Sequence, residues 1–233
     1  LLGTSDRRPV ADFFARRIGV AVETFRSPIL VPDRDERGMS AAATLLHSAR
    51  RLPAYLRSVV RVGRNLRDAR PDVVVNFFDL VGAAALLLYR PGRFRLAVGH
   101  HFLTRHPDFP RPDEAGIGWW GLRLLTRLCG LGTHRRLALS FRPLPDPDSR
   151  TRVHPPLLRR AILEAEPVGG DHLQVYVLNP GYARELEEWH RRNREIRVEA
   201  FWDREGAPGC LELHPNLRVH RVDDRTFIEG LRS

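Results

Sequence analysis

Two short apolar runs, with a helix-length apolar segment between them, give the clearest pattern in the chain. Residues 73–75 are three valines, a run too short for a helix, and residues 96–98 form a second such run. Runs of this kind are typical of strands that are buried on both faces. The apolar segment 80–89 between them ends before Pro91 and Gly92. Strand, helix and strand within about thirty residues predict one βαβ unit with parallel strands.

Polar residues follow both predicted strands. Asn76 and Asp79 come after the first strand, and His100 and His101 come after the second, next to Gly99, which leaves room for a substrate. In open parallel sheets ligands bind beyond the carboxyl ends of the strands, so a site is predicted here. Histidine titrates near neutral pH and suits a general base; the alternative is that one histidine only bonds the loop and shapes the cleft. Asp79 is an alternative base, a residue that orients a histidine, or the N-cap of the following helix.

The rest of the first half also has α/β character. Residues 40–69 have a helical pattern that begins at a good N-cap, Ser40, and contains Pro53, which predicts a kink or a division into two helices. The arginines of this segment occupy much of its polar face. A solvated surface and a surface that contacts anionic lipid headgroups both fit that pattern. Further predicted elements are a helix at 8–18, a strand at 20–25, a helix at 117–131 and a strand at 136–141.

A change of pattern near residue 155 divides the chain. Pro155 and Pro156 make a stiff junction, and a pair of glycines at 169–170 makes a flexible one. We therefore predict an N-terminal domain over residues 1–155, a linker over 156–170 and a C-terminal domain over 171–233. Strands are predicted at 172–178, 196–202 and 217–222, with helices at 182–192 and 225–231. That order begins a second Rossmann-like sheet.

A strand-to-helix turn in the second half is a candidate phosphate site. Asn179, Pro180 and Gly181 precede the predicted helix that starts at Tyr182. The free N–H groups and the dipole of a helix N-terminus favour the diphosphate of a nucleotide sugar, and glycine permits close approach of the backbone. An ordinary βα turn is the alternative.

Several segments resemble a glycosyltransferase family. Pro71-Asp-Val-Val-Val75, Gly99-His-His-Phe-Leu103 and His106-Pro-Asp-Phe109 look like parts of bacterial and archaeal glycosyltransferases with the GT-B fold, distant relatives of the enzyme that adds N-acetylglucosamine to lipid I. The resemblance continues through Leu137-Ala-Leu-Ser-Phe141 and Tyr176-Val-Leu-Asn-Pro-Gly-Tyr182. It implies an α/β fold with two Rossmann-like domains of the GT-B type, the C-terminal one incomplete.

The resemblance also implies a chemistry. It implies a glycosyl transferase that moves a sugar from a nucleotide sugar to a glycosyl acceptor, for which a lipid-linked molecule is one candidate. The acceptor would bind the N-terminal domain and the donor the C-terminal one, with the nucleotide base near Val222, Phe227 and Ile228. No metal and no cofactor are expected. The family's early glycine-rich loop and its later glutamate-bearing helix are not found in the sequence, so we expect a chain truncated at both ends.

Composition narrows the remaining choices. The formal net charge is +10, and all 38 basic residues are arginine, which excludes a Schiff-base or P-loop lysine. Coding bias and attraction to phosphates, lipid or nucleic acid both explain this charge. No apolar run reaches membrane-spanning length, and the first residues do not show the pattern of a signal peptide. Cys129 and Cys210 do not form a disulfide framework. We therefore predict a cytoplasmic protein, with or without membrane association.

Two other functions and one metal site were weighed against parts of the sequence. A nucleotide-sugar epimerase needs acids and a histidine in a similar cleft. A non-enzymatic anion- or nucleic-acid-binding protein fits the charge, but no RRM, KH or helix-turn-helix signature is present, so no specific nucleic acid is predicted. A zinc site built from His100, His101 and His106 lacks a nearby carboxylate or cysteine, and no metal site is therefore predicted.

Overall fold

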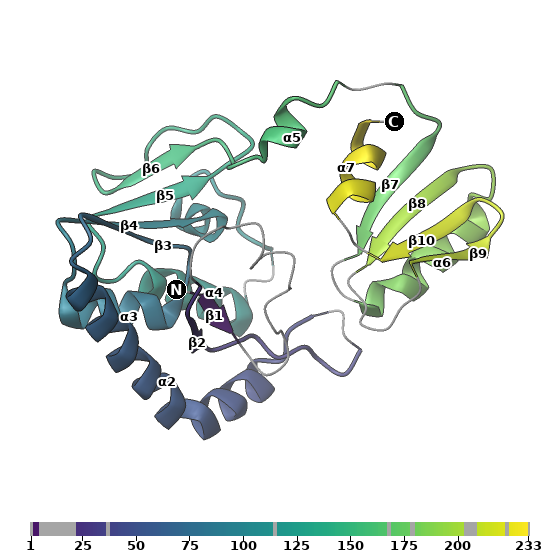
Figure 1. Cartoon of the computed structure of the whole chain (residues 1–233). Helices are drawn as coiled ribbons and strands as arrows, with labels where there is room; N and C mark the ends of the chain where they lie inside the picture. Colours follow the sequence, from purple (N-terminus) through teal and green to yellow (C-terminus); the bar gives the residue numbers. More distant parts are fainter. Residues whose placement is uncertain are drawn as a thin grey trace. The chain divides into compact units, whose positions relative to one another are not determined.

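The chain has an α/β fold with two parallel-rich sheets (Figure 1). The computed structural model describes residues 2–4, 22–35, 38–113, 116–166, 169–177, 180–202, 209–221 and 224–232. Two compact units are present: unit 1 comprises Leu1–Leu30 and Thr44–Leu157, and unit 2 comprises Val31–Ala43 and Leu158–Ser233. Each unit holds one of the four-stranded sheets, a pattern compatible with Rossmann-like architecture.

Unit 1 is built on a parallel sheet with the strand order β3-β4-β5-β6. Its strands are β3 (Val73–Asn76), β4 (Phe94–Gly99), β5 (Arg135–Leu139) and β6 (Thr151–His154). Helix α3 (Leu80–Tyr89) joins β3 to β4, a 3₁₀ helix η1 (His100–Arg105) follows β4, and α4 (Ile117–Cys129) precedes β5. The parallel pairing of β3 and β4 around α3 confirms the predicted βαβ unit.

Strand β3 differs from the prediction in its burial. Val73 is 55% exposed and Val75 is 43% exposed, so the prediction of a strand buried on both faces is wrong here. Among the described strands β3 stands at the end of its sheet and pairs only with β4. Strand β4 lies between two neighbours, and its Ala97 and Val98 are buried as predicted.

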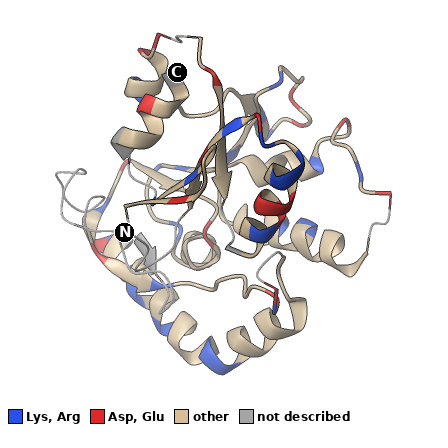
Figure 2. Cartoon of the chain, turned by 90° about the vertical axis from the view of Figure 1, so that its right-hand side faces the viewer, with Lys and Arg blue, Asp and Glu red and all other residues tan. Residues whose placement is uncertain are grey.

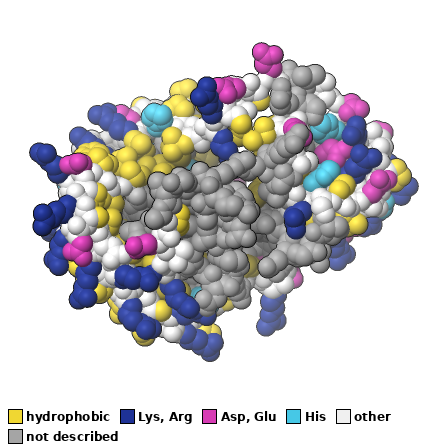
Figure 3. All heavy atoms as spheres, in the orientation of Figure 1, with side chains coloured by type: hydrophobic (Ala, Val, Ile, Leu, Met, Phe, Trp, Pro, Cys, Tyr) yellow, Lys and Arg dark blue, Asp and Glu magenta, His cyan; other side chains and the backbone are white. Residues whose placement is uncertain are grey.

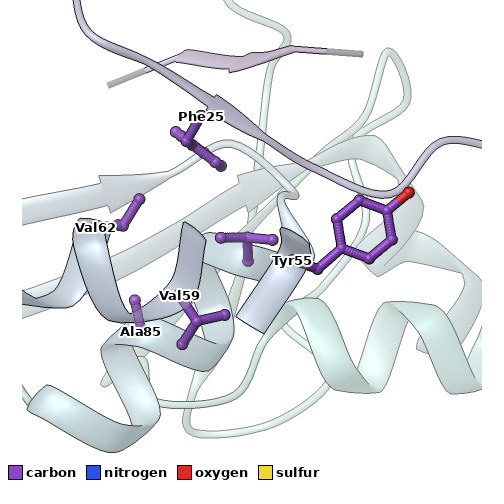
Figure 4. Close-up of a cluster of buried hydrophobic side chains, with 6 residues drawn as sticks. Phe25, Tyr55, Val59, Val62 and Ala85 are labelled. Carbon is purple, nitrogen blue, oxygen red and sulfur yellow. The ribbon is translucent and has the colours of Figure 1, made fainter. Parts of the chain in front are cut away.

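A long helix covers part of unit 1. Helix α2 (Ala41–Ala69) begins at Ser40, whose hydroxyl accepts the N–H of Ala43 at 3.2 Å, and it continues past Pro53 without the predicted division. The apolar side of α2 packs against α3 and against β2 (Thr24–Arg26), which pairs in parallel with β1 (Leu2–Thr4). The resulting core cluster contains Phe25, Tyr55, Val59, Val62, Val81 and Ala85 (Figure 4).

Unit 2 has a mixed sheet with the strand order β7-β8-β10-β9. Its strands are β7 (His172–Val177), β8 (Arg197–Trp202), β9 (Cys210–His214) and β10 (Leu217–Arg221). Strands β7, β8 and β10 are parallel, and β9 pairs antiparallel with β10. The helical elements are α5 (Arg160–Leu163), η2 (Pro180–Tyr182), α6 (Ala183–Arg192) and α7 (Asp224–Arg232). Buried Val198, Ala200 and Leu217 belong to the core of this unit.

The sequence predictions and the described structure do not cover the same elements everywhere. The predicted helix at 8–18 falls outside the described residues. Strands β6 and β9 were not predicted from the sequence. In the part of the chain that the structure describes, every helix is too short or too polar to cross a bilayer.

Candidate functional site

Two adjacent histidines lie where strand β4 ends. Strand β4 delivers them to the carboxyl edge of the unit 1 sheet, and they open the 3₁₀ helix η1. His100 is exposed and His101 is half-buried. The centroids of their rings are 3.9 Å apart. Thr104, buried in the same turn, donates its hydroxyl to the main-chain oxygen of His101 at 2.8 Å and fixes the start of η1.

Phe78 holds His101 in place, and it was not predicted from the sequence. Its ring stacks on the imidazole of His101 at 4.4 Å with an interplanar angle of 20°, and its edge meets Phe102 at 5.5 Å. Phe78 has a φ of +53°, a left-handed conformation that a bulky residue rarely adopts. The stacked ring of Phe78 therefore restricts the orientation of the His101 imidazole.

Gly99 makes room for this aromatic ring. A Cβ atom on Gly99 would lie 3.2 Å from the Cβ and Cδ2 atoms of Phe78. The space beside Gly99 is therefore occupied by Phe78, and the prediction that it admits a substrate is wrong.

The environment of His101 favours its neutral form. Burial of the ring and the nearby His100 both lower the pKa of His101 below its ordinary value. A histidine with a lowered pKa is unprotonated at neutral pH and can accept a proton. His101 is thus stacked on Phe78 and, in its neutral form, can accept a proton.

Asp79 is the N-cap of helix α3. Its Oδ1 atom accepts the N–H of Gly82 at 2.6 Å, and its Oδ2 atom accepts the hydroxyl of Ser27. Within the described residues, no hydrogen bond or ion pair joins Asp79 to His100 or His101. The structure therefore assigns Asp79 the capping alternative and does not place it as the partner of a histidine.

Asn76 ties the end of β3 to two other elements. Its amide oxygen accepts the N–H of Asp79 at 3.2 Å, and its amide nitrogen donates to the main-chain oxygens of Asp79 (2.9 Å) and Cys129 (3.3 Å). Asn76 is only 6% exposed, and its hydrogen bonds give it a structural role in holding these elements together. Burial, together with the charge of Asp79, raises the pKa of Cys129 to about 12, and this thiol is no nucleophile at neutral pH.

A cavity of about 400 Å³ opens beside β3. Its apolar lining includes Phe25, Val75 and Phe77, and its polar lining comes from Asn76 and Asp79. The histidine pair does not belong to this lining. The cavity therefore lies between β3, β2, α2 and α3, and the histidines are a separate part of the carboxyl edge of the sheet.

His106 is used in the structure of a loop. Its Nδ1 atom accepts the N–H of Asp108 at 3.0 Å, which leaves Nε2 to donate to the main-chain oxygen of Pro145 at 2.8 Å. Both ring nitrogens thus have partners, and the zinc site with His100 and His101 lacks its third ligand. No three His, Cys, Asp or Glu side chains in the described ranges gather closely enough to hold a metal ion.

The candidate phosphate turn lies in unit 2. Gly181 and Tyr182 belong to η2 (Pro180–Tyr182), directly before α6, and Tyr182 is 43% exposed. Tyr182 is the N-cap of α6 and makes no capping hydrogen bond through its side chain. Glu185 in the first turn and the basic residues of the last turn suit the helix dipole. Asn179 and Val222 lie outside the described residues.

The two residues predicted beside the nucleotide base lie on α7. Phe227 meets the ring of Phe201 at 5.3 Å and that of Tyr176 at 5.9 Å, each edge to face. Its main-chain oxygen accepts the side-chain amide of Gln174 at 3.0 Å. Phe227 thus packs α7 onto the sheet, and Ile228 beside it is half-buried.

Unit 2 also contains a buried carboxylate that was not predicted from the sequence. Glu199 on β8 is 9% exposed and lies 2.6 Å from Nε2 of His220 on β10, while Arg197 donates to the same carboxylate at 2.9 and 3.1 Å. Burial alone would raise the pKa of Glu199, but the hydrogen bonds from His220 and Arg197 outweigh burial and lower it. The alternation of charged and apolar residues along β8 was the signal for it in the sequence.

No model of a protein family matches the chain, and no curated protein sequence matches it.

Proposed function

We propose that the protein is a glycosyltransferase in which His101 is the general base for the acceptor. The observation that carries the proposal is the place of His101 at the carboxyl edge of a parallel sheet, half-buried, stacked on Phe78 and with a lowered pKa. In this reaction His101 removes the proton from an acceptor hydroxyl. The hydroxyl oxygen then bonds to the anomeric carbon of the donor sugar, and the nucleoside diphosphate leaves.

The donor side of the proposal rests on unit 2. A GT-B arrangement of two Rossmann-like domains would bring a nucleotide sugar bound by unit 2 to the acceptor bound by unit 1. The start of α6, where the Tyr182 side chain makes no capping hydrogen bond, suits the diphosphate because it is the positive end of the helix dipole. Neither a metal nor a cofactor is part of this proposal.

A lipid-linked acceptor is favoured by the surface of helix α2. Leu52, Leu56 and Val60 are exposed there, beside a hollow of about 430 Å³ whose lining includes Arg57, Arg61 and Arg64. Asp68 is the only acidic residue of the helix. Blue bands mark the arginines along the lowest helix in Figure 2, and the same helix shows blue and yellow side chains together in Figure 3. Basic amphipathic helices of this type bind anionic membrane surfaces.

Turnover of variants tests the assignment of the base. The protein is screened against nucleotide sugars with lipid and soluble acceptors, and the release of nucleoside diphosphate is measured. His101→Ala should lower kcat about 10²-fold or more, leave the Kd for the donor unchanged and remove the acidic limb of the rate–pH profile. If His100→Ala and His101→Ala both keep full turnover, the histidines are structural and the proposal is wrong.

Donor binding is tested separately. Gly181→Val places a branched side chain where the diphosphate would approach the backbone, so nucleotide binding should be lost while the melting temperature is kept. Unchanged nucleotide affinity would remove this part of the proposal.

The same assays separate the alternatives. An epimerase would convert the nucleotide sugar into its isomer without an acceptor and without release of the nucleotide. A nucleic-acid-binding protein would show salt-dependent affinity for DNA or RNA and no sugar chemistry.

A further inference from the structure

A second charged hollow lies at the opposite edge of the unit 1 sheet, where the parallel strands begin. The residues that lead into β4, β5 and β6 meet there around a cavity of about 540 Å³. The lining of this amino-edge hollow consists of Arg93, Phe94, His134, Arg135, Ser149 and Arg150. Strand β4 has six residues, so the hollow is about 17 Å from the histidine pair at its other end.

The lining carries three guanidinium groups and no carboxylate. Arg135 donates to the main-chain oxygen of Ser149, a neutral partner, and this contact fixes the guanidinium at the rim. Among the described residues, no carboxylate lies within ion-pair distance of Arg93, Arg135 or Arg150. Within the described part of the chain, the positive charge of the hollow is therefore not compensated by an ion pair with a carboxylate. Dark blue side chains follow this edge of unit 1 at the left of Figure 3.

Asp148, which precedes Ser149 and Arg150 in the chain, makes its contacts outside the lining of the hollow. Asp148 accepts the main-chain N–H groups of Arg150 and Thr151, each at 2.7 Å, and lies 4.0 Å from the guanidinium of Arg136. Asp148 thus organises the turn before β6 and balances a different arginine. This turn holds the main chain of Arg150, and the side chain of Arg150 is part of the lining of the hollow.

Arg95 is not part of the lining, but it contacts one of the lining residues, His134. Its guanidinium donates to the main-chain oxygen of Gly132 at 2.7 Å and approaches those of three residues before β4 at 3.3–3.5 Å. Its main-chain N–H donates to Nδ1 of His134 at 3.0 Å, and the ring of His134 stacks on Phe94 at 5.7 Å. The floor of the hollow is therefore held by several hydrogen bonds and by one ring contact.

We propose that the amino-edge hollow binds a small ligand with two or more phosphate groups. Guanidinium groups match phosphate oxygens with paired N–H donors, and several of them around one hollow favour an anion with more than one phosphate. The site is distinct from the candidate active site because it lies at the other end of the strands. It does not depend on the glycosyltransferase proposal.

Calorimetry with inorganic diphosphate tests the site. The wild-type protein should bind diphosphate, and the affinity should fall as salt is added. Arg150→Gln should weaken binding about tenfold, and the double variant Arg93→Gln/Arg150→Gln should weaken it further, because each change removes charged hydrogen bonds. Arg127→Gln, which removes the same charge from an exposed position on α4, is the matched control and should keep full affinity.

The controls also separate this site from the donor site. Gly181→Val should leave diphosphate binding at the hollow unchanged. Arg150→Gln and the double variant Arg93→Gln/Arg150→Gln should keep the circular dichroism spectrum of the wild type. The proposal is overturned if the wild type does not bind diphosphate, if the double variant binds it as tightly as the wild type, or if Arg127→Gln loses as much affinity as Arg150→Gln. Binding of polynucleotides alone, with no binding of diphosphate, would also overturn it.

Discussion

At the scale of single residues, the candidate site depends on one close contact between two side chains that the sequence does not connect. His100 and His101 could be placed from the sequence, because a buried β-run ends directly before them. Phe78 could not, because its left-handed φ of +53° and its stacking on His101 come from tertiary packing that the pattern of residue types does not encode.

The packing of Phe78 against Gly99 gives the first prediction. Gly99→Ala should destabilise unit 1 by about 1–2 kcal/mol, since its Cβ would crowd the ring of Phe78 at 3.2 Å. The displaced ring should also uncover His101, so its lowered pKa should rise toward the ordinary histidine value. Urea unfolding and an NMR titration of the imidazole measure the two effects.

The control for this substitution is a glycine with free space around it. Gly121 stands inside α4, and apart from its own helix backbone and its two chain neighbours no described atom lies within 4 Å of a Cβ placed on it. Gly121→Ala should therefore stabilise the protein by up to about 1 kcal/mol. Equal effects of the two substitutions would show that Gly99 has no special packing role.

Asp79 can be tested for capping and for base chemistry in one experiment. Serine is also a good N-cap, but it has no carboxylate. Asp79→Ser should keep most of the stability, whereas Asp79→Ala should lose about 1 kcal/mol, because only alanine leaves the N–H of Gly82 without its side-chain acceptor. If Asp79→Ser keeps stability but loses turnover, the carboxylate has a catalytic role that the geometry does not show.

At the scale of elements, the sequence predicted the order of helices and strands better than their environments. Strand β3 was identified from its valines, but its burial was overestimated because the run does not reveal how many neighbours a strand has. Strand β6 has four residues, directly before two prolines, and β9 has mostly exposed residues. Both depend on pairing with a neighbour, which a local pattern does not show.

Helix α2 also differs from the sequence prediction, because it continues through a proline. Pro53 was expected to kink or divide it, but one helix continues through Pro53, stabilised by the packing of Tyr55, Val59 and Val62 against β2 and α3. Proline lacks an N–H donor and costs about 3 kcal/mol in an exposed helix interior, a cost that tertiary packing can outweigh.

The contact between α2 and α3 predicts that Gly63→Ala lowers stability in the wild type but raises it when Tyr89 is removed. A Cβ on Gly63 would lie 2.2 Å from the ring of Tyr89. Gly63→Ala should therefore destabilise the wild type by roughly 1–3 kcal/mol. In a Tyr89→Ala background the clash is gone, and the same change should stabilise α2 by up to about 1 kcal/mol. A double-mutant cycle from thermal unfolding measures the coupling, and a coupling near zero would contradict this account of the contact.

At the scale of the whole molecule, each unit has its own sheet and its own buried cluster, so each can be followed by its own probe. Trp119 and Trp120 belong to unit 1, and Trp189 and Trp202 belong to unit 2. With Trp119 and Trp120 replaced by Phe, tryptophan fluorescence reports the unfolding of unit 2 alone.

That reporter tests the buried carboxylate of unit 2. The folded-state pKa of Glu199 is lowered, so the stability it contributes is present above its unfolded pKa of about 4.3 and is lost as the pH falls through the folded value. Glu199→Gln should be less stable than the parent at pH 7 by about 1–3 kcal/mol, because the charged hydrogen bonds to His220 and Arg197 are weakened. Below the pKa of Glu199 the difference between the two proteins should shrink, since the parent carboxyl is then protonated. Glu212→Gln removes an exposed carboxylate 3.7 Å from Arg218 and should change stability by less than about 1 kcal/mol. A stability difference for Glu199→Gln that stays constant from pH 7 to pH 3 would contradict the assignment.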